Sequence, residues 1–374
     1  MKIVVKEVAT KRELRQFVTF PNKLYKNNPY YVPQLVQAEI DTLTPEKNHA
    51  FDVCEGKYWL AYSDGKIAGR IAGIINHDYN QRNGAVYVRF GWLDFVDNKE
   101  VAEALVATVE AWAKTKNARY VCGPVGFLEF DVSGVLVEGF DQLPTAYGKY
   151  NAPYYATYIE GLGYKKEVDW VEYQIKIPDK FPENVIEMSE KIAVRYNVKL
   201  LQFDNKKELV NKYCDKIFKL MNRQYERVHG YTQLSQGQID DLKKQFIPLL
   251  NLKFVTIVID KDDEVIGFAI CLPSLSKALQ KANGSMYPFG FMHILGALRK
   301  NDTIDSLLVA VATEYQNKGI TAMMFSRLWQ QMHDNGFTTI ESTRQWEDNL
   351  QVRNLWNRFE YKLHKRARSY IKEL

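Results

Sequence analysis

The chain carries two copies of one sequence pattern, and this repeat limits what it can fold into. Residues 58–75 read YWLAYSDGKIAGRIAGII, and residues 254–272 read FVTIVIDKDDEVIGFAICL. In each segment apolar residues alternate on both sides of a short polar turn, which predicts two antiparallel strands joined as a hairpin. Aligning GKIAG with DEVIG places Gly69 on Gly267, a spacing of about 200 residues that is far too long for a solenoid repeat.

The end of each copy repeats as well. GLGYKKEVDWVEYQI in the first copy aligns with RFEYKLHKRARSYI in the second at almost the same spacing, so that Tyr164 meets Tyr361 and Tyr173 meets Tyr370. A nearly constant spacing between two separate pairs of segments indicates duplication of a whole domain. We therefore predict an α/β fold with mixed α+β sheets, built as two tandem domains.

The boundary between the copies is predicted in IPDKFPENV, residues 177–185, where two prolines interrupt the preceding strand. The first domain would span residues 1–178, and the second would span residues 179–374. The chain has the length of two ordinary domains, and its 46% hydrophobic residues provide for two buried cores.

Composition argues against several classes of protein. The 50 Lys and Arg residues exceed the 45 Asp and Glu residues only slightly, which gives no support for nucleic-acid binding. The four cysteines are far apart and the six histidines form no HExxH-like pair, so neither a metal site nor a disulfide framework is predicted. The N-terminus lacks the apolar core of a signal peptide, and no apolar run approaches the ~18 residues of a membrane span. We expect a soluble, cytoplasmic protein.

The second copy shows the order of its elements most clearly. Helices are predicted over 206–228 and 235–250, then the hairpin, a strand at 305–313, a helix at 318–334, a strand at 337–342, a helix near 349–359 and a final strand pair. The 318–334 helix places apolar residues on one stripe that is typical of a core face: Ile320, Met323, Met324, Leu328 and Met332. The connection 273–302 reads as long and irregular, and such loops tend to carry function.

The turn EYQNKGITAMM, between the strand and the helix of the second copy, predicts an anion site. The backbone amides of Asn317 to Thr321 would lie at a helix N-terminus, where unsatisfied N–H groups and the helix dipole favour a phosphate or pyrophosphate. Gly319 would allow close approach, Lys318 would add a positive charge, and Gln316 would add a neutral donor. A lone glycine at such a turn more often only shapes the backbone, so the turn alone leaves both interpretations open.

In this context the sequence resembles a known family. A strand, Q-x-x-G-x at the start of a helix, a second strand, and then a helix that begins with an acidic residue and Asn are similar to the acyl-CoA N-acyltransferases of the GNAT superfamily. Their [RQ]-x-x-G-x-[GA] signature is matched by Gln316 and Gly319, with Thr321 in place of the small residue. The resemblance implies that acetyl-CoA or a longer acyl-CoA is the co-substrate.

The resemblance also implies where the co-substrate lies. Its pyrophosphate would rest on the amides of residues 316–321, which include Asn317, Lys318 and Ile320, while the main chain of Val309 and Val311 would face the pantetheine arm. A second segment, WEDNLQVRNLWNRFEYK, is similar to the family motif N-x-x-A-x-x-L-Y-x-x-x-G-F.

In this second segment Asn349 and Leu355 match the family motif, and both Asn349 and Trp356 are implied to contact the co-substrate. Trp356 stands where the family often has the tyrosine that protonates the leaving thiolate. An indole N–H donates a hydrogen bond but does not ionise usefully, so we predict that another acid or water protonates the thiolate.

A narrower resemblance spans nearly the whole chain. FPNKLYKNNPYYVPQL, GRIAGIINHDYN and CGPVGFLEFDVSGVLVEGFDQLPTAYGKYNAPYYATYIEGLGY are similar to segments of a bacterial family of tandem acyltransferase domains, the YghO-like proteins. Some proteins of this broad type resemble bacterial ceramide synthases, which transfer a fatty acyl group to the amine of a long-chain base. The resemblance implies a small-molecule or lipid amine as acceptor, with no metal and no nucleic acid.

The corresponding turn of the first copy, WLDFVDNKEVAEALVATVEAW, is predicted not to bind CoA. It lacks the glycine, and Asp94, Asp97 and Glu100 would repel a pyrophosphate. Asp97 and Glu100 also have the spacing of a capping box, which would satisfy the helix N-terminus from within. This copy would support the fold and wall a substrate cleft through residues 123–131 and the tyrosine-rich segment 147–158, although packing between the domains explains the tyrosines equally well.

Four residues are candidates for the general base that deprotonates the amine: Glu314, His293, Glu341 and Glu347. Each also has a structural explanation. These are, in the same order, a surface carboxylate, a loop histidine, an ion pair at a strand end and a carboxylate at a helix start. The oxyanion donor implied by the resemblance is a backbone amide of the strand at Val309 to Val311.

These observations favour an acyl-CoA-dependent N-acyltransferase acting on an amine, with a long-chain lipid amine as one candidate. The apolar segment 289–298 and the basic C-terminal end predict a long acyl chain and peripheral contact with a membrane. Two alternatives stay open: a tRNA-dependent aminoacyl transferase, and a catalytically inactive tandem domain that binds a lipid or peptide.

Overall fold

The structure of the protein, a computed structural model, describes residues 2–178, 184–226, 228, 230–349, 353–357 and 359–374. The chain divides into two compact units. Unit 1 comprises residues 1–171, 275–296 and 364–374, and unit 2 comprises residues 172–274 and 297–363. Residues 179–183 of the predicted boundary segment lie outside the described residues, and a division of the repeats after residue 178 stays a prediction.

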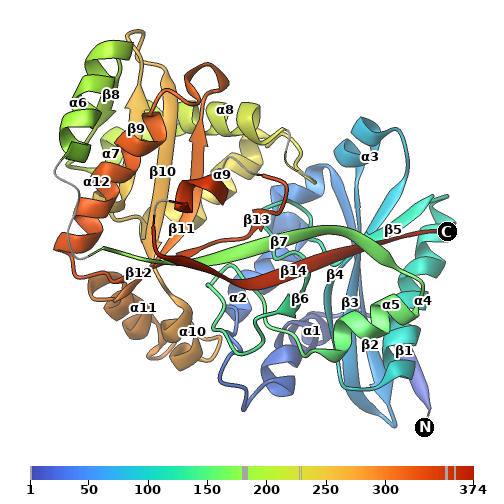
Figure 1. Cartoon of the computed structure of the whole chain (residues 1–374). Helices are drawn as coiled ribbons and strands as arrows, with labels where there is room; N and C mark the ends of the chain where they lie inside the picture. The colour runs from blue at the N-terminus through green and yellow to red at the C-terminus, as the bar shows by residue number, and fades with distance from the viewer. Residues whose placement is uncertain (1, 179–183, 227, 229, 350–352, 358) are drawn as a thin grey trace. The chain divides into compact units, whose positions relative to one another are not determined.

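Unit 1 is built on a sheet with the strand order β1-β2-β3-β4-β5-β14, and β6 pairs with β14 (Figure 1). The β4–β5 pair is parallel and its neighbours are antiparallel. The strands are β1 (Ile3–Glu7), β2 (Cys54–Ser63), β3 (Lys66–Asn76), β4 (Tyr87–Phe95), β5 (Tyr120–Gly123), β6 (Val135–Glu138) and β14 (Tyr361–Glu373). The helices are α1 (Lys11–Leu24), α2 (Val36–Thr42), α3 (His77–Asn83), α4 (Lys99–Thr115), α5 (Tyr154–Gly161) and α10 (Ser276–Ala282), with most of α11 (Gly290–Arg299).

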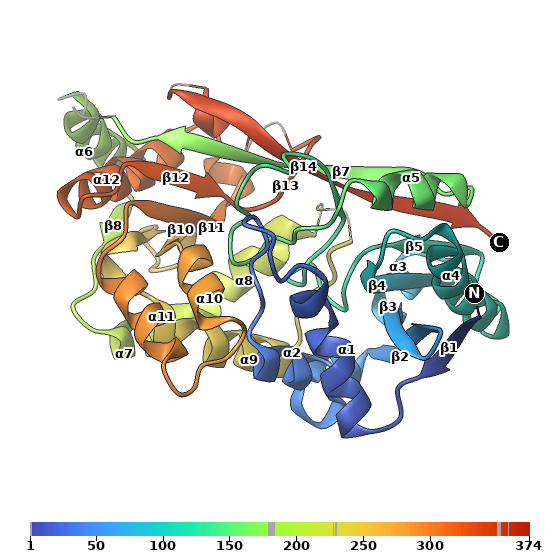
Figure 2. The same ribbon diagram turned by 90° about the horizontal axis from the view of Figure 1, so that it is seen from below.

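Unit 2 repeats this plan with the strand order β8-β9-β10-β11-β12-β7, and its β11–β12 pair is parallel (Figure 2). The strands are the end of β7 (Lys165–Lys176, from residue 172 on), β8 (Lys199–Leu201), β9 (Val255–Ile259), β10 (Val265–Pro273), β11 (Thr303–Val311), β12 (Thr339–Ser342) and β13 (Gln345–Trp346). The helices are α6 (Asn184–Tyr196), α7 (Lys206–Glu208), α8 (Cys214–Tyr225), α9 (Gln236–Phe246) and α12 (Ile320–Asp334). The mixed α/β architecture predicted from the sequence is thus confirmed.

Gly69 and Gly267 occupy equivalent positions in the two units. Gly69 lies on β3, where an added Cβ would come within 2.7 Å of Leu105 on α4. Gly267 lies on β10, where an added Cβ would come within 3.0 Å of Ile320 on α12. In each unit the glycine therefore lets the helix that follows the fourth strand of the repeat lie close to the sheet, and this shared role supports the alignment of the repeats.

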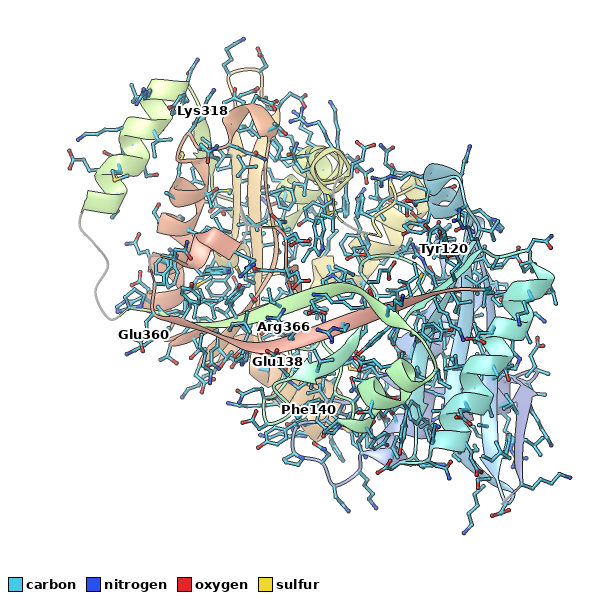
Figure 3. All side chains as sticks on the ribbon, turned by 45° about the vertical axis from the view of Figure 1, so that its right-hand side comes forward. Tyr120, Glu138, Phe140, Lys318, Glu360 and Arg366 are labelled. Carbon is cyan, nitrogen blue, oxygen red and sulfur yellow. The ribbon has the colours of Figure 1, made fainter. Side chains whose placement is uncertain are left out.

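Each unit is closed by the last strand of the other repeat. In unit 1, β14 pairs with β5, so that Tyr370 lies opposite Gly123. In unit 2, β7 pairs with β12, so that Ile175 lies opposite Ile340. In unit 1 the β14 residue Arg366 also forms a 3.1 Å ion pair with Glu138 of the neighbouring strand β6 (Figure 3).

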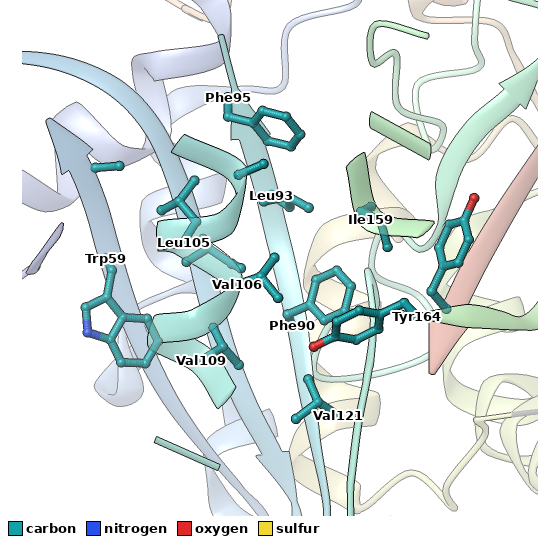
Figure 4. Packing of buried hydrophobic residues seen from close by; sticks show 14 of the residues in the cluster. Trp59, Phe90, Leu93, Phe95, Leu105, Val106, Val109, Val121, Ile159 and Tyr164 are labelled. Carbon is teal, nitrogen blue, oxygen red and sulfur yellow. The ribbon is translucent and has the colours of Figure 1, made fainter. Parts of the chain in front are cut away.

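The core of unit 1 lies on both sides of its sheet. One cluster forms where α4 covers the strands and includes Trp59, Phe90, Leu105 and Tyr164 (Figure 4). A second cluster of buried residues includes Phe17 of α1 and lies on the other face of the same sheet. In unit 2, α12 packs against β9, β10 and β11, and the apolar stripe predicted for this helix is buried as expected: Ile320, Met323, Met324, Leu328 and Met332.

Four details of the sequence prediction were wrong. The connection 273–302 is not irregular, because it contains α10 and α11. The final strand pair is one long strand, β14. The N-cap of α4 is Asn98 rather than Asp97, and its side chain accepts a hydrogen bond from the Val101 amide. Asp94 does not repel ligands at the surface, because it is fully buried and neutralised by Arg70 at 2.8 Å.

Candidate functional site

The parallel strands of unit 2 separate at a defined point. The register of β11 with β12 ends at the pair Ser306–Ser342, while β11 continues to Val311 alongside β10. Thr343 holds the end of the paired region, because its backbone N–H donates to the Ser306 carbonyl at 3.2 Å and its hydroxyl donates to the Leu307 carbonyl at 3.2 Å. Beyond this point β11 is still paired with β10 on one side, but its other edge is no longer paired with β12. We call this the separated edge.

Val309 and Val311 direct their main-chain groups to this separated edge. The amide of Ala312 donates to the Ile266 carbonyl at 2.8 Å, so Ala312 faces β10. Because main-chain groups alternate between the two sides of an antiparallel strand, those of Val309 and Val311 point the opposite way. The Tyr225 hydroxyl donates to the Val309 carbonyl at 3.3 Å, and Gln316 Nε2 donates to the Val311 carbonyl at 3.2 Å.

The turn from β11 to α12 ends in a helix N-terminus without a side-chain cap. Asn317 and Gly319 both have positive φ angles, of 60° and 83°, and Gly319 is the N-cap of α12. Because the N-cap residue is a glycine, it has no side chain that could accept a hydrogen bond from the first-turn amides. The first-turn amides of Ile320 and Thr321 are therefore suited to an anion, as predicted, provided that the anion can reach them.

Helix α6 lies directly against this turn. A Cβ on Gly319 would come within 2.5 Å of Ile192 Cδ1, so the glycine is required both by its backbone angle and by this contact. The Lys318 ammonium lies over two aromatic rings, 5.4 Å from the centroid of Tyr196 and 5.2 Å from that of Tyr315 (Figure 3). Lys318 is exposed despite these contacts, which position its charge beside the helix N-terminus.

The structure brings most of the predicted co-substrate residues together in one turn of unit 2: Val309, Val311, Gln316, Asn317, Lys318, Gly319, Ile320 and Thr321. The side chain of Ile320 is buried in the core, so only its amide is available, whereas Thr321 is partly exposed. Asn349 lies in the turn after β13, where its amide donates to the Trp346 carbonyl at 3.0 Å.

Trp356 is a core residue of unit 2. Its side chain is only 1% exposed and packs edge-on against Phe325 of α12, with ring centroids 5.7 Å apart. Within the described part of the chain its indole Nε1 has no hydrogen-bond partner. A contact between this N–H and a thioester sulfur stays a prediction.

The predicted carboxylates have different surroundings. Glu314 lies on the exposed turn after β11, and its carboxylate forms a 3.1 Å ion pair with Arg223. The pKa of Glu314 is lowered, first by a hydrogen bond from its own backbone N–H and then by Arg223, so this carboxylate is a weak base. Glu341 is buried on β12, where it accepts a 2.7 Å hydrogen bond from Gln174.

The two remaining candidates for the base lie on other segments. The Glu347 carbonyl accepts a 2.6 Å hydrogen bond from Arg353 in the turn that follows β13. His293 is exposed on α11 and belongs to unit 1. The roles of all four residues as bases stay predictions.

Sequence reasoning missed two features near the separated edge. Tyr225, the last residue of α8, puts a phenol on the Val309 carbonyl, and burial raises the pKa of this phenol to about 12. Arg344, just beyond β12, forms a buried 3.2 Å ion pair with Glu172 of β7, and burial lowers the pKa of Arg344. Neither residue lies in a recognisable motif, because both reach the site through pairing of distant segments.

Comparison with known proteins gives the family. Residues 215–361 match the acetyltransferase (GNAT) family. The chain is 26% identical over 381 positions to Protein YghO of Escherichia coli (strain K12), covering 99% of this chain and 95% of that protein. It is 25% identical to a bacterial ceramide synthase of Caulobacter vibrioides, covering 78% of this chain and 75% of that protein.

Solved structures agree on the fold. A tandem GNAT protein from the clavulanic acid biosynthesis pathway, without AcCoA, is 12% identical with a TM-score of 0.55 and is matched over 100% of this chain and 98% of its own. A GCN5-related N-acetyltransferase from Sphaerobacter thermophilus is 9% identical with a TM-score of 0.51, over 99% and 95% of the two chains.

These matches define the class of protein: the chain has the fold of a tandem GNAT protein, and residues 215–361 in its second half match the GNAT family. Within that class it is similar to Protein YghO over nearly its whole length and to a bacterial ceramide synthase over most of it, as the sequence resemblance indicated. Among the described residues, no group of three or more His, Cys, Asp or Glu side chains could hold a metal ion.

Proposed function

We propose that the second repeat binds an acyl-CoA thioester along β11 and the turn before α12, and that it transfers the acyl group to an amine. The observation that carries this proposal is the combination of the separated β11 edge with the uncapped N-terminus of α12 at its end. The first supplies main-chain groups for an extended polar arm, and the second supplies donors for a pyrophosphate.

The residues of this chain fit such a co-substrate in three respects. Val309 and Val311 turn their main chain toward the separated edge, the amides of Ile320 and Thr321 begin α12, and the Lys318 ammonium lies beside them. Extended main chain can hold the amides of a pantetheine arm by strand-like hydrogen bonds. A bound thioester supplies an activated carbonyl carbon and a thiolate leaving group.

The chain's own residues would then handle orientation and protons. The backbone N–H of Val309 or of Val311 on β11 would donate to the developing oxyanion. When the amide bond forms and the C–S bond breaks, the amine loses a proton and the sulfur gains one. We assign the donor to the sulfur to the Tyr225 phenol, because its hydroxyl contacts the Val309 carbonyl at the separated edge of β11.

The acceptor is proposed to be a lipid amine with a long chain. Support for this comes from the 25% identity to a bacterial ceramide synthase. Arg344 follows β12 and forms a buried ion pair with Glu172. This pair would provide polar contacts for the head group of such a substrate. The first repeat is proposed not to bind the co-substrate.

The experiment is a direct assay of transfer. The purified chain is mixed with acetyl-CoA or palmitoyl-CoA and a long-chain base, and thiol release and amide product are measured together. We expect amide formation with palmitoyl-CoA and at least about tenfold tighter binding of palmitoyl-CoA than of acetyl-CoA, because more apolar surface is buried. Tight binding without any amide product would favour the inactive lipid-binding alternative, and equal affinities would remove the reason for a lipid substrate.

A further inference from the structure

Helix α11 and the turn before it expose an unusual number of large apolar side chains. Five lie between residues 287 and 295: Tyr287 (81% exposed), Phe289 (67%), Phe291 (38%), Met292 (58%) and Leu295 (47%). On the same helix only Gly290 and Ile294 are buried. The side of α11 that faces the protein is therefore narrow, and its outer side is apolar.

This pattern is the reverse of the usual one for a surface helix, which presents polar residues to water. Helix α6 provides a comparison within the same chain. It also exposes apolar side chains, at Ile186, Met188 and Val194, but the charged residues Glu187, Lys191 and Arg195 lie between and beside them. The exposed apolar residues of α6 are thus interspersed with charge, whereas residues 287–295 contain no Asp, Glu, Lys or Arg.

The charge around this apolar run has one sign. Residues 275–301 contain no Asp or Glu, and they contain four basic residues, all exposed: Lys277, Lys281, Arg299 and Lys300. Aromatic side chains flanked by lysine and arginine are the composition found where a protein meets the interface of an anionic bilayer.

The segment is firmly attached to unit 1, so its outer side is held outward. The Ser276 hydroxyl donates to the Pro144 carbonyl at 2.7 Å, and Gln280 donates to the Pro29 carbonyl at 2.8 Å. The Val36 amide donates to the Gly284 carbonyl at 2.9 Å. Gly290 lies close to Ala282, where an added Cβ would come within 3.1 Å, and this contact connects α11 to α10.

We propose that the outer side of residues 277–300 is a docking surface for an anionic phospholipid bilayer. The aromatic and apolar side chains would enter the boundary between headgroups and acyl chains, while the basic residues would contact lipid phosphates. No helix in the described ranges is both long and apolar enough to cross a bilayer, and the contact proposed here is a peripheral one. Such a surface would deliver the protein to substrates that reside in the bilayer.

The test is co-sedimentation of the full chain with vesicles, in the absence of any acyl donor. One set of vesicles is pure phosphatidylcholine, and the other contains about a third phosphatidylglycerol. We expect strong binding to the anionic vesicles and weak binding to the neutral ones, with binding that falls as salt is raised. The double substitution F289S/F291S should lower the partition coefficient by about tenfold or more.

Two further variants complete the test. K277E/K281E should reduce binding to anionic vesicles toward the level for neutral vesicles, and the α6 variant M188S/V194S should bind like the parent chain. Because all of these side chains are exposed, the midpoint of thermal unfolding should change little in each variant. Equal binding by F289S/F291S and the parent would overturn the proposal.

The proposal would also be overturned if the parent failed to bind vesicles and F289S/F291S converted a dimer to a monomer in light scattering, since the surface would then join two copies of the chain. Because no acyl donor is present, either result leaves the proposed acyl transfer untouched.

Discussion

The fourth strands of the two repeats, β4 and β11, end in the same way, but different side chains contact their separated edges. In unit 2 the separated edge of β11 bears the Val309 and Val311 carbonyls, contacted by Tyr225 and Gln316. In unit 1 the register of β4 with β5 likewise ends early, at Arg89–Cys122, while β4 continues to Phe95. The sheet therefore opens at the same place in both repeats.

In unit 1 this edge is filled by the tyrosine-rich segment. The Lys149 ammonium donates to the Leu93 carbonyl at 2.9 Å, the Phe95 amide donates to the Tyr155 hydroxyl at 2.9 Å, and the Tyr154 hydroxyl donates to the Phe95 carbonyl at 2.6 Å. Both main-chain groups of Phe95 are thus satisfied from within. An arm that needed these groups would have to displace three side chains, of which Tyr155 is fully buried.

The N-termini of α4 and α12, the helices that follow these two strands, also differ. Helix α4 is capped by Asn98, which accepts from the Val101 amide at 3.1 Å, whereas α12 begins at Gly319 without a side-chain cap. In unit 1 buried and part-buried side chains satisfy the strand edge and a side chain caps the helix, whereas in unit 2 two side chains contact the edge carbonyls and the helix begins at a glycine. The comparison teaches that a repeated fold can separate a structural copy from a binding copy by a few side chains.

The largest expected effect is that of T321E. Thr321 lies in the first turn of α12 and is partly exposed, so a glutamate there should keep or slightly stabilise the helix through the dipole. Its carboxylate would repel the pyrophosphate from the same amides. We expect affinity for acyl-CoA to fall by about a hundredfold, on the order of 3 kcal/mol, in calorimetry.

Two control variants make this result specific. T321Q has the size of the glutamate without its charge and should lose much less affinity. K99E places the same charge in the first turn of α4 and should not change binding, because that turn is proposed not to hold the co-substrate. Unchanged affinity in a folded T321E protein would break the comparison at its main point. G319E is a poorer test, since it also collides with Ile192.

The next two predictions compare the loss of a tyrosine hydroxyl in each repeat. Y225F removes the proposed proton donor, and we expect kcat to fall by about tenfold to a hundredfold while the Kd for acyl-CoA stays within about threefold. Because burial raises the pKa of Tyr225 to about 12, the donor is lost only above that pH, and the parent enzyme should show no alkaline limb below pH ~11. W356F should retain substantial activity.

Y155F is the matched variant in unit 1. It removes a buried hydroxyl that accepts from the Phe95 amide and from the Tyr25 hydroxyl, so it should lower the free energy of unfolding by about 1–3 kcal/mol. Activity per folded molecule should not change. If Y155F lost activity and Y225F lost only stability, the roles assigned to the two edges would be reversed.

A smaller effect is expected for E314Q. The carboxylate of Glu314 has a lowered pKa and pairs with Arg223, so it is poorly suited to accept a proton from an amine. We expect kcat/KM to change by less than about threefold near neutral pH. A loss of several orders of magnitude in a protein with normal co-substrate affinity would identify Glu314 as the base.

The smallest effect concerns the cap of the structural copy. N98A removes the hydrogen bond to the Val101 amide and should lower the free energy of unfolding by about 1 kcal/mol, measured with denaturant. Binding of acyl-CoA should be identical to that of the parent. A change in binding would mean that this turn, too, takes part in the site.

The features that could be predicted from sequence were those encoded locally. Alternation around Asp64-Gly65 predicted the first hairpin, and both residues do have the positive φ that such a turn requires. The helical spacing of Ile320, Met324 and Leu328 predicted the buried side of α12. The turn at Gly319 was recognisable because its glycine follows a buried strand and precedes a helix.

Features that depend on distant segments were missed. Nothing local in residues 147–158 shows that Lys149 and Tyr155 fill the edge of β4, and nothing near Tyr225 shows that it reaches Val309. The helices α10 and α11 were missed, and Asn283 and Gly284 form a turn between them. Both indeed have positive φ, but each helix is short and gains its stability from tertiary contacts with unit 1.

The central claim is that only the second repeat holds the co-substrate, and the stoichiometry of binding tests it most directly. A short-chain acyl-CoA would be titrated into the parent chain and into T321E by isothermal calorimetry. The account predicts one site per chain in the parent and loss of that site in T321E. Two sites per chain, or one site that persists with unchanged affinity in a folded T321E protein, would contradict it.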